Sequence, residues 1–383
     1  MSKEFLFTSE SVTEGHPDKV CDQISDAILD EILVQDKNAR VACETLATTD
    51  LVVVSGEITT ENHPDYEKIV RQSIKDIGYT DPNETFCDTT LKLISIITQQ
   101  SSQISQGVTA TTSQSGDQGA GDQGIMFGYA TDESPEMMPL PILLAHRLTK
   151  GLTDDRKAGN VAWLLPDNKS QVSVAYENNE PKLVSAVVVS TQHTTAVKQK
   201  QIAEYVREDL GPRVLGQWWN QDLALLVNPT GDFSHGGPAA DAGVTGRKII
   251  VDTYGGWGRH GGGAFSGKDP SKVDRSSAYF CRFVARQVVA AGLARRVEIQ
   301  LGYAIGMAKP VSVKIDTFGT GDSRAAEEFV ENTFDFRPRA IIEQLDLLRP
   351  IYRNTTNYGH FGRPELPWET VEKAAAAARA AGS

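Results

Sequence analysis

Two strand-like segments followed by a helical segment recur three times along the chain, and this repeat constrains the fold more than any other feature. Apolar and polar residues alternate over 41–58, and the alternation returns over 171–190 and 297–317. A helical spacing of apolar residues follows each pair of strands, over 69–77, over 196–209 and from 324 onward. The second strands end near 58, 190 and 317, a spacing of about 130 residues. The pattern predicts three similar units.

The order of elements within each unit predicts an α+β fold. Strand pairs followed by a helix favour mixed or antiparallel sheets with helices on one face, rather than a doubly wound parallel sheet. We expect an N-terminal repeat over 1–102, a flexible loop over 103–124, a central repeat over 125–234 and a C-terminal repeat over 235–383, in which structural domains can combine non-contiguous segments. Chance spacing within an α+β protein is the alternative to a true repeat.

The composition is that of a globular protein with a large core, because 40% of the 383 residues are hydrophobic. The net charge of −12 argues against a nucleic acid or an anionic membrane as partner. The four cysteines match neither C-x-x-C nor zinc spacing, which indicates reduced thiols. No apolar run reaches the roughly 20 residues of a membrane span, and the N-terminus lacks a signal-peptide pattern. We therefore expect a cytoplasmic protein.

A glycine-rich segment at 260–269, HGGGAFSGKD, indicates a phosphate-binding loop. Glycine lets backbone N–H groups approach an anion closely, and Lys268 adds a positive charge. The segment differs from a Walker A loop at Asp269, where a hydroxyl residue would bind Mg²⁺, so an ordinary P-loop NTPase is disfavoured. An esterase oxyanion segment is disfavoured as well, because no G-x-S-x-G elbow accompanies it.

Two predicted helices frame this chemistry, one over about 18–34 and one from about 275 to a terminal glycine at 292. The first follows the segment GHPDK and the second follows the glycine loop, so both segments lie at helix N-termini, which favour anions. Asp18 and Asp274 are carboxylates beside cations and suit Mg²⁺ bound together with a polyphosphate. Asp18 can instead be an ordinary N-cap.

Residues 99–124 are rich in Gln, Ser, Thr and Gly and have few apolar anchors. Such a segment in an enzyme is commonly a lid, and a disordered insertion is the alternative. Its end matches G-x-G-x-x-G, but neither a preceding strand nor a following helix supports a Rossmann site. The alanine-rich run at 374–381 predicts a surface helix.

Five motifs together closely resemble the S-adenosylmethionine synthetase (methionine adenosyltransferase) family. They occur in the family's order along nearly the whole chain, as GHPDK at 15–19, GAGDQG at 119–124, DAGVTGRK at 241–248, GGGAFSGKD at 261–269 and YGHFGR at 358–363. The resemblance implies three similar α/β-sandwich domains with mixed sheets, related by a pseudo-threefold repeat. It also implies a homodimer or homotetramer with active sites between subunits.

The resemblance implies synthesis of S-adenosyl-L-methionine from ATP and L-methionine. The methionine sulfur attacks C5′ of ATP, and the released triphosphate is hydrolysed to phosphate and pyrophosphate. Two Mg²⁺ ions per site and K⁺ are the implied cofactors. Because negative charge develops on the triphosphate, catalysis is expected from preorganised cations and in-line positioning rather than from a covalent nucleophile.

Site residues follow from the resemblance by matching position. The catalytic, triphosphate-binding set is His16, Lys169, Arg247, Lys248 and Lys268. Further ATP contacts are Asp167, Phe233, Asp241 and Ala264. The methionine-binding set is Glu57, Gln100, Asp122, Asp241 and Lys272. The implied metal ligands are Asp18 and Asp274 for Mg²⁺ and Glu44 for K⁺; for Glu44 and Glu57 a solvated strand face is the alternative.

The chain departs from the family pattern at 232–235. Asp232 stands where relatives usually carry Arg, and Ser234 and His235 stand where they carry an apolar pair. The loop before residue 124 also looks longer than in common bacterial relatives. An ATP-dependent phosphotransferase of another class, which would release ADP, and a non-catalytic nucleotide-binding subunit are the rival functions. The intact set of cations argues against the second.

Overall fold

The computed structural model describes residues 4–99 and 117–372. Most of the loop predicted at 103–124, the predicted site residue Gln100 and the helix predicted at 374–381 lie outside the described residues. None of the described helices is long and apolar enough to span a membrane.

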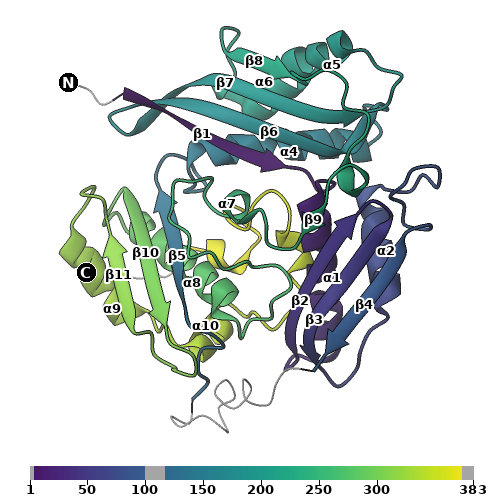
Figure 1. The fold of residues 1–383 in the computed structure, drawn as a ribbon. Helices are drawn as coiled ribbons and strands as arrows, with labels where there is room; N and C mark the ends of the chain where they lie inside the picture. Colours follow the sequence, from purple (N-terminus) through teal and green to yellow (C-terminus); the bar gives the residue numbers. More distant parts are fainter. Residues whose placement is uncertain (1–3, 100–116, 373–383) are drawn as a thin grey trace.

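Three sheets carry the three predicted hairpins, and Figure 1 shows them around the periphery of the molecule with the short helix α7 near its centre. The strands of the first sheet are β9 (Gly243–Val244), β2 (Arg40–Thr48), β3 (Leu51–Thr59) and β4 (Lys92–Thr98), in that order. Those of the second are β1 (Glu4–Val12), β6 (Leu164–Glu177), β7 (Glu180–His193) and β8 (Ala224–Val227). Those of the third are β5 (Gly124–Thr131), β10 (Arg296–Tyr303) and β11 (Ser312–Asp316).

The pairing directions confirm the predicted α+β class. Each hairpin is antiparallel, while β4 runs parallel to β3 and β8 runs parallel to β7. Two sheets are therefore mixed, and the third is antiparallel. The hairpins agree with the sequence pattern, whereas the strands that flank them were not predicted.

The flanking strands are exchanged between units. Each unit begins with a strand and a long helix before its hairpin, but that first strand pairs with the hairpin of another unit. Thus β1 pairs with β6, β5 pairs with β10, and β9 pairs with β2. The exchange links the three sheets in a ring, so every sheet combines segments that are distant in sequence. The sequence boundaries at 102, 124 and 234 stay a prediction.

The helices pack on one face of each sheet and build the core. The long helices are α1 (Pro17–Gln35), α4 (Leu140–Lys157) and α8 (Val273–Ala290). The shorter ones are α2 (Tyr66–Ile77), α5 (Gln199–Tyr205), α6 (Gly211–Leu215), α7 (Ile249–Asp252), α9 (Ser323–Thr333) and α10 (Pro338–Gln344). α1 packs against β2 and β9, α4 against β1 and β6, and α8 against β5 and β10. Because each long helix contacts an exchanged strand, helix packing supports the ring.

One predicted helix is interrupted. The helix expected over 196–209 consists of α5, a π-helical turn (Val206–Leu210) and α6. Pro212 has no N–H to donate in the usual i→i−4 pattern, and the N–H of Gly211 bonds instead to the carbonyl of Val206 five residues back. The interruption lies away from the candidate site.

The opposite faces of the sheets are open and partly apolar. Strand residues on them are between 46% and 65% exposed: Leu6, Ile94, Ile96, Ile125, Leu183 and Leu226. Soluble monomers seldom expose many large apolar side chains on flat sheets, so these faces are candidate interfaces.

Candidate active site

The start of α1 brings together a histidine, an aspartate and a lysine. His16 caps the helix, because its Nδ1 accepts the N–H of Asp18 at 3.2 Å, and Pro17 occupies the first helical position. The Asp18 carboxylate accepts the N–H of Val244 at 3.0 Å and the Nζ of Lys248 at 2.6 Å. The alternative that Asp18 is the N-cap is therefore wrong, and its carboxylate faces the segment that carries Lys248.

Burial and neighbouring cations set the charges at this helix start. Burial, with Lys248 and Lys169 nearby, lowers the pKa of His16 to about 3, so the imidazole is neutral at neutral pH. Burial opposes ionisation of Asp18, but hydrogen bonds from Lys248 and Val244 outweigh it and lower the pKa of that carboxyl. Since Nδ1 of His16 accepts a hydrogen bond, the proton of the neutral ring lies on Nε2.

Strand β6 adds two predicted site residues to this helix start. Asp167 is buried, and its Oδ2 accepts the N–H of Gly237 at 2.9 Å. Burial raises the pKa of Asp167 to about 6, with Asp241 adding to the effect and Lys169 and Lys248 opposing it. Lys169 is exposed and lies opposite Val12, the last residue of β1. The end of β1 therefore places the start of α1 beside β6.

Phe233 is held next to this group by a buried histidine that the sequence analysis missed. The Phe233 N–H donates to Nε2 of His193 at 3.2 Å, and the His193 N–H donates to the Phe233 carbonyl. Asp232, the departure from the family pattern, is exposed and lies 3.6 Å from the same Nε2. Nothing in the local sequence pattern signalled His193.

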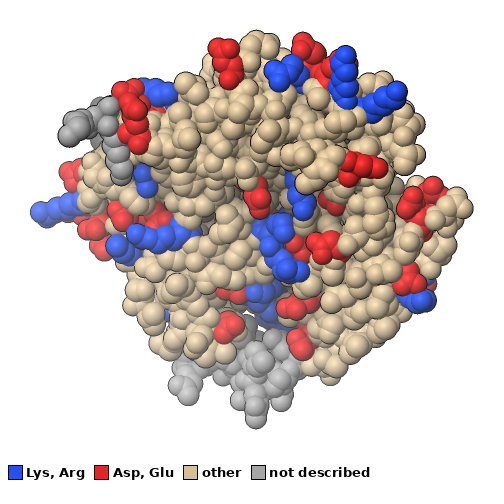
Figure 2. Space-filling view, turned by 45° about the horizontal axis from the view of Figure 1, so that its top comes forward, with Lys and Arg blue, Asp and Glu red and all other residues tan. Residues whose placement is uncertain are grey.

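We call these residues the α1 cluster, and it contains His16, Asp18, Asp167, Lys169, Phe233, Asp241, Arg247 and Lys248. Figure 2 shows Lys and Arg side chains beside Asp and Glu side chains near the middle of one face, with largely uncharged surface around them. Within residues 4–99 and 117–372, neither Lys169 nor Arg247 has an ion-pair partner, and both are exposed. These two cations are free to meet an anion.

The glycine loop lies along the edge of β2. Cys43 donates its N–H to Gly267 at 2.9 Å, and Asp269 donates to Val41 at 3.1 Å, which places Lys268 opposite Ala42. Gly267 has φ +79°, and a Cβ there would lie 1.9 Å from the Cys43 carbonyl oxygen. Only glycine allows this approach.

The start of α8 repeats the combination of histidine, aspartate and lysine. The Nζ of Lys268 donates to Asp274 at 2.7 Å, and Nδ1 of His260 accepts the N–H of Gly262 at 2.8 Å. Burial lowers the pKa of His260, and Asp274 opposes the shift. Gly263 leaves room for Asp274, because a Cβ there would lie 2.4 Å from that carboxyl.

Two predicted methionine-binding residues lie in segments that meet at the α8 start. Lys272 donates from Nζ to the buried Asp269 at 2.5 Å. A Cβ on Gly121 would lie 2.9 Å from the carbonyl oxygen of Ser271, so the segment carrying the exposed Asp122 packs beside Lys272. We call Lys268, Lys272, Asp274, Ala264 and Asp122 the α8 cluster.

The two clusters touch through Ala264. A Cβ on Gly246 would lie 2.3 Å from the Ala264 Cβ, so the residue before Arg247 contacts the glycine loop. Glu44 and Glu57, in contrast, are exposed on the open face of the first sheet, opposite to α1. Because directly opposed residues share a face, Lys268 lies on this open face with Ala42 and Glu44.

Comparison with known proteins identifies the family. The N-terminal, central and C-terminal domain models of S-adenosylmethionine synthetase match residues 4–102, 117–233 and 235–370. An S-adenosylmethionine synthase from Sorangium cellulosum (strain So ce56) is 57% identical over 376 residues, which cover 97% of this chain and 89% of that protein. The chain belongs to the S-adenosylmethionine synthetase family. It is therefore an enzyme of the methionine adenosyltransferase class, which synthesises S-adenosylmethionine.

The two predicted Mg²⁺ ligands, Asp18 and Asp274, are isolated carboxylates at the helix starts. Among the described residues, no group of three or more His, Cys, Asp or Glu side chains is arranged to hold a metal. Asp18 and Asp274 each form an ion pair with a lysine. An anion bound by that lysine would therefore lie close to the carboxylate as well. This donor set fits Mg²⁺, which takes one or two carboxylates and completes its shell with phosphate oxygens and water.

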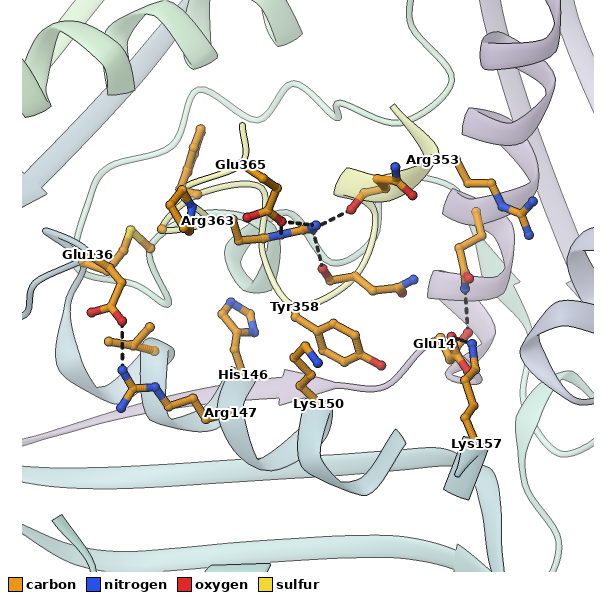
Figure 3. A pocket seen from close by; sticks show the side chains of 18 of the residues that line it. Glu14, Glu136, His146, Arg147, Lys150, Lys157, Arg353, Tyr358, Arg363 and Glu365 are labelled. Atoms are coloured by element: carbon orange, nitrogen blue, oxygen red, sulfur yellow. Dashed lines mark hydrogen bonds and ion pairs between the residues drawn. The ribbon is translucent and has the colours of Figure 1, made fainter. Parts of the chain in front are cut away.

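A cavity of about 650 Å³ lies between α4 and the segment 353–365 and is lined by none of the predicted site residues, although Glu14, two residues before His16, lines it (Figure 3). Its basic side chains are each paired with an acid: Arg147 with Glu136, Lys150 with Asp154, Lys157 with Glu14, Arg353 with Asp76, and Arg363 with Glu365. Among the described residues, no lysine or arginine of this cavity is unpaired, whereas the α1 cluster has Lys169 and Arg247 without ion-pair partners, so the α1 cluster is the better candidate for a polyphosphate.

Proposed function

We propose that the chain makes S-adenosyl-L-methionine by attack of the methionine sulfur on C5′ of ATP. A lone pair of sulfur forms the S–C5′ bond while the C5′–O5′ bond breaks, and the electron pair leaves with the triphosphate. Water then cleaves the triphosphate to phosphate and pyrophosphate. The observation that carries the proposal is the pair of helix starts, each of which holds a carboxylate and a lysine beside a glycine-rich segment.

The cations of both clusters supply the electrostatic stabilisation. Lys169 and Arg247 are exposed and unpaired within the described residues, while Lys248 and Lys268 are held by Asp18 and Asp274. Fixed cations stabilise charge that develops on a leaving group without the reorganisation that water needs. We infer that the triphosphate binds between an α1 start and an α8 start, with Asp167, Phe233, Asp241 and Ala264 toward the nucleoside.

His16 has a defined part in this arrangement. The ring is neutral and its proton lies on Nε2, so it donates a hydrogen bond without bringing a second charge next to Lys248. A donor of this kind is suited to the oxygen that leaves C5′, where charge is greatest in the transition state. His16 thus complements the lysines rather than duplicating them.

Asp18 and Asp274 would hold Mg²⁺, and Glu44 would hold K⁺. The Mg²⁺ ions, when bound, neutralise charge on the triphosphate. Methionine binding is assigned to Glu57, Gln100, Asp122, Asp241 and Lys272. Asp122 and Lys272 lie on adjoining segments at the α8 start, which supports their grouping.

We infer a homodimer or homotetramer with active sites between subunits. Glu44 and Glu57 lie on the open face of the first sheet, away from the α1 cluster of the same chain, and that face also exposes Ile94 and Ile96. A second chain packed on the open faces would cover the apolar residues. Glu44, Glu57 and Lys268 of the first chain would then contact the surface of the second chain.

The test is incubation with ATP, L-methionine, Mg²⁺ and K⁺, with mass detection of the sulfonium product and separate assays of phosphate and pyrophosphate. We expect one sulfonium, one phosphate and one pyrophosphate for each ATP consumed. Omitting methionine is the control and removes the sulfonium. Release of ADP in place of the sulfonium would assign the chain to another class of ATP-dependent transferase.

A further inference from the structure

Four aspartates on one face of α1 each accept backbone hydrogen bonds from another part of the chain. They are spaced four residues apart, so their side chains follow one another along the helix, one turn at a time. The donors are Val244 N–H to Asp18, Gly246 N–H to Asp22, Gly267 N–H to Asp26, and the N–H groups of Tyr352 and Arg353 to Asp30. The four carboxylates therefore attach three separate segments to a single rigid helix.

Asp22 holds the segment that carries two of the proposed triphosphate cations. Its Oδ1 accepts the Gly246 N–H at 2.8 Å, and Arg247 and Lys248 follow directly in the chain. Asp22 is completely buried. Gly246 has φ +77° and no room for a Cβ beside Ala264, so the segment has little freedom at the point of attachment.

Asp26 holds the glycine loop in the same way one helical turn later. Its Oδ1 accepts the Gly267 N–H at 2.8 Å, and Lys268 follows directly in the chain. Both oxygens of Asp26 also accept the guanidinium of Arg275 at 2.6 and 2.7 Å. The bidentate contact fixes the orientation of the carboxylate.

We propose that Asp22 and Asp26 are positioning residues that set the places of the two cation-bearing segments along α1. The glycine directly before Arg247 and the glycine directly before Lys268 are bound to carboxylates one helical turn apart, a rise of about 6 Å. Misplacing catalytic groups by about 1 Å can cost roughly a hundredfold in rate. The inference rests on the proposed roles of Arg247, Lys248 and Lys268 and adds the means by which they are placed.

Asp22 is a better residue to substitute than Asp26, because removing its negative charge does not leave a buried cation without a partner. Lys19 donates to both Asp22 and Asp252, and all three side chains are buried. One cation faces two carboxylates, so removing the charge of Asp22 leaves a balanced pair. Asp26, in contrast, neutralises the buried Arg275 and cannot be removed without exposing that charge to an apolar core.

The experiment compares Asp22→Ala, Lys248→Ala and the double variant in the full-length enzyme, with kcat and the KM for ATP measured separately. We expect Asp22→Ala to lower kcat about 10- to 100-fold with a smaller change in KM. In the Lys248→Ala background the same substitution should lower kcat by a smaller factor than in the unsubstituted enzyme, because one of the two cations that Asp22 positions is gone. In the Lys268→Ala background its full effect should remain.

Asp30→Ala is the matched control, because Asp30 makes the same kind of bond to the backbone but holds residues 352 and 353, which carry no proposed site residue. It should leave kcat within twofold. Asp22→Asn keeps an acceptor for Gly246 and should restore most of the lost kcat. If Asp22→Ala does not fold, Asp22→Ser takes its place, because a hydroxyl one bond shorter does not reach Gly246.

Full multiplication of the Asp22→Ala and Lys248→Ala effects, or an equal loss of kcat in Asp30→Ala, would overturn the proposal and leave only a general structural role. Unchanged kcat in Asp22→Ala would overturn it as well. Failure of the proposed function looks different, because the unsubstituted enzyme would then form no sulfonium product at all.

Discussion

The starts of α1 and α8 are two versions of one local design. Each has a histidine whose Nδ1 accepts the N–H two residues later, an aspartate in the first turn, and a lysine from a neighbouring loop bound to that aspartate. They differ in the burial of the carboxylate: the Asp18 side chain is 5% exposed and that of Asp274 is 22% exposed, while Lys248 and Lys268 are similar at 21% and 24%. The stability of the protein should depend more on the ion pair of the buried Asp18, because water cannot solvate this carboxylate well when its lysine is removed.

The largest effect is expected for Lys248→Ala. The substitution removes a proposed triphosphate cation and leaves the buried carboxylate of Asp18 without its ion-pair partner. We expect kcat to fall by about 10³ and the melting temperature to fall by a few degrees. Steady-state kinetics and a thermal melt measure the two effects. Normal stability of this variant would show that the burial of Asp18 matters less than the comparison implies.

Lys268→Ala tests the same design at the more exposed helix start. Its kcat should fall by about 10²–10³, more than its affinity for ATP changes, because the contact matters most when charge develops on the leaving group. The melting temperature should stay near that of the unsubstituted protein, since water reaches Asp274. A rate within threefold of the unsubstituted enzyme would remove Lys268 from the proposed triphosphate site.

Asp18→Asn and Asp274→Asn compare the two proposed magnesium ligands. Because His16 is the cap of α1, substitution of Asp18 does not remove a helix cap. We expect the Mg²⁺ concentration for half-maximal activity to rise about tenfold in each variant, on the scale of lost ligand support at metal sites. Titration of activity with Mg²⁺ is the measurement. An unchanged Mg²⁺ titration in both variants would show that the two aspartates do not bind Mg²⁺ and only form ion pairs with their lysines.

The effect expected to be smallest at neutral pH is the pH dependence of stability, because it develops only on the acid side. The pKa of His16 is about 3 in the folded protein and near 6.5 when unfolded, so between these values the unfolded state binds a proton that the folded state does not. Stability contributed by His16 is present above pH 6.5 and is lost as the pH falls toward 3, by at most about 1.4 kcal/mol per pH unit.

His16→Gln should therefore flatten the acid side of the stability profile, measured by denaturant unfolding at several pH values. His260→Gln provides the comparison. Burial lowers the pKa of His260 as well, and an aspartate opposes the shift at both histidines, but Lys248 and Lys169 add to the shift at His16. Substitution of His260 should therefore flatten the profile less. Equal slopes in the two variants would mean that burial does not distinguish the helix starts.

Local patterns predicted the elements well, because helix and strand periods are properties of neighbouring residues. The helix expected over 18–34 is α1 at Pro17–Gln35, and the hairpin expected over 41–58 is β2 and β3. The cap at α1 was less predictable, because aspartate is the commoner cap. In the structure His16 caps the helix, Pro17 is its first residue, and Asp18 binds Lys248 instead. The family motifs named the site residues, but their roles remain a prediction.

The sequence by itself determined three similar units, the α+β class and the family to which the chain belongs. The tertiary structure decided that β1, β5 and β9 are exchanged between units, and that α1 carries the segments before Arg247 and Lys268. The physical reason is that strand pairing and hydrogen bonds to α1 join residues up to 323 positions apart. Such partners are selected by packing over the whole chain, whereas the periods of helices and strands repeat within a few residues.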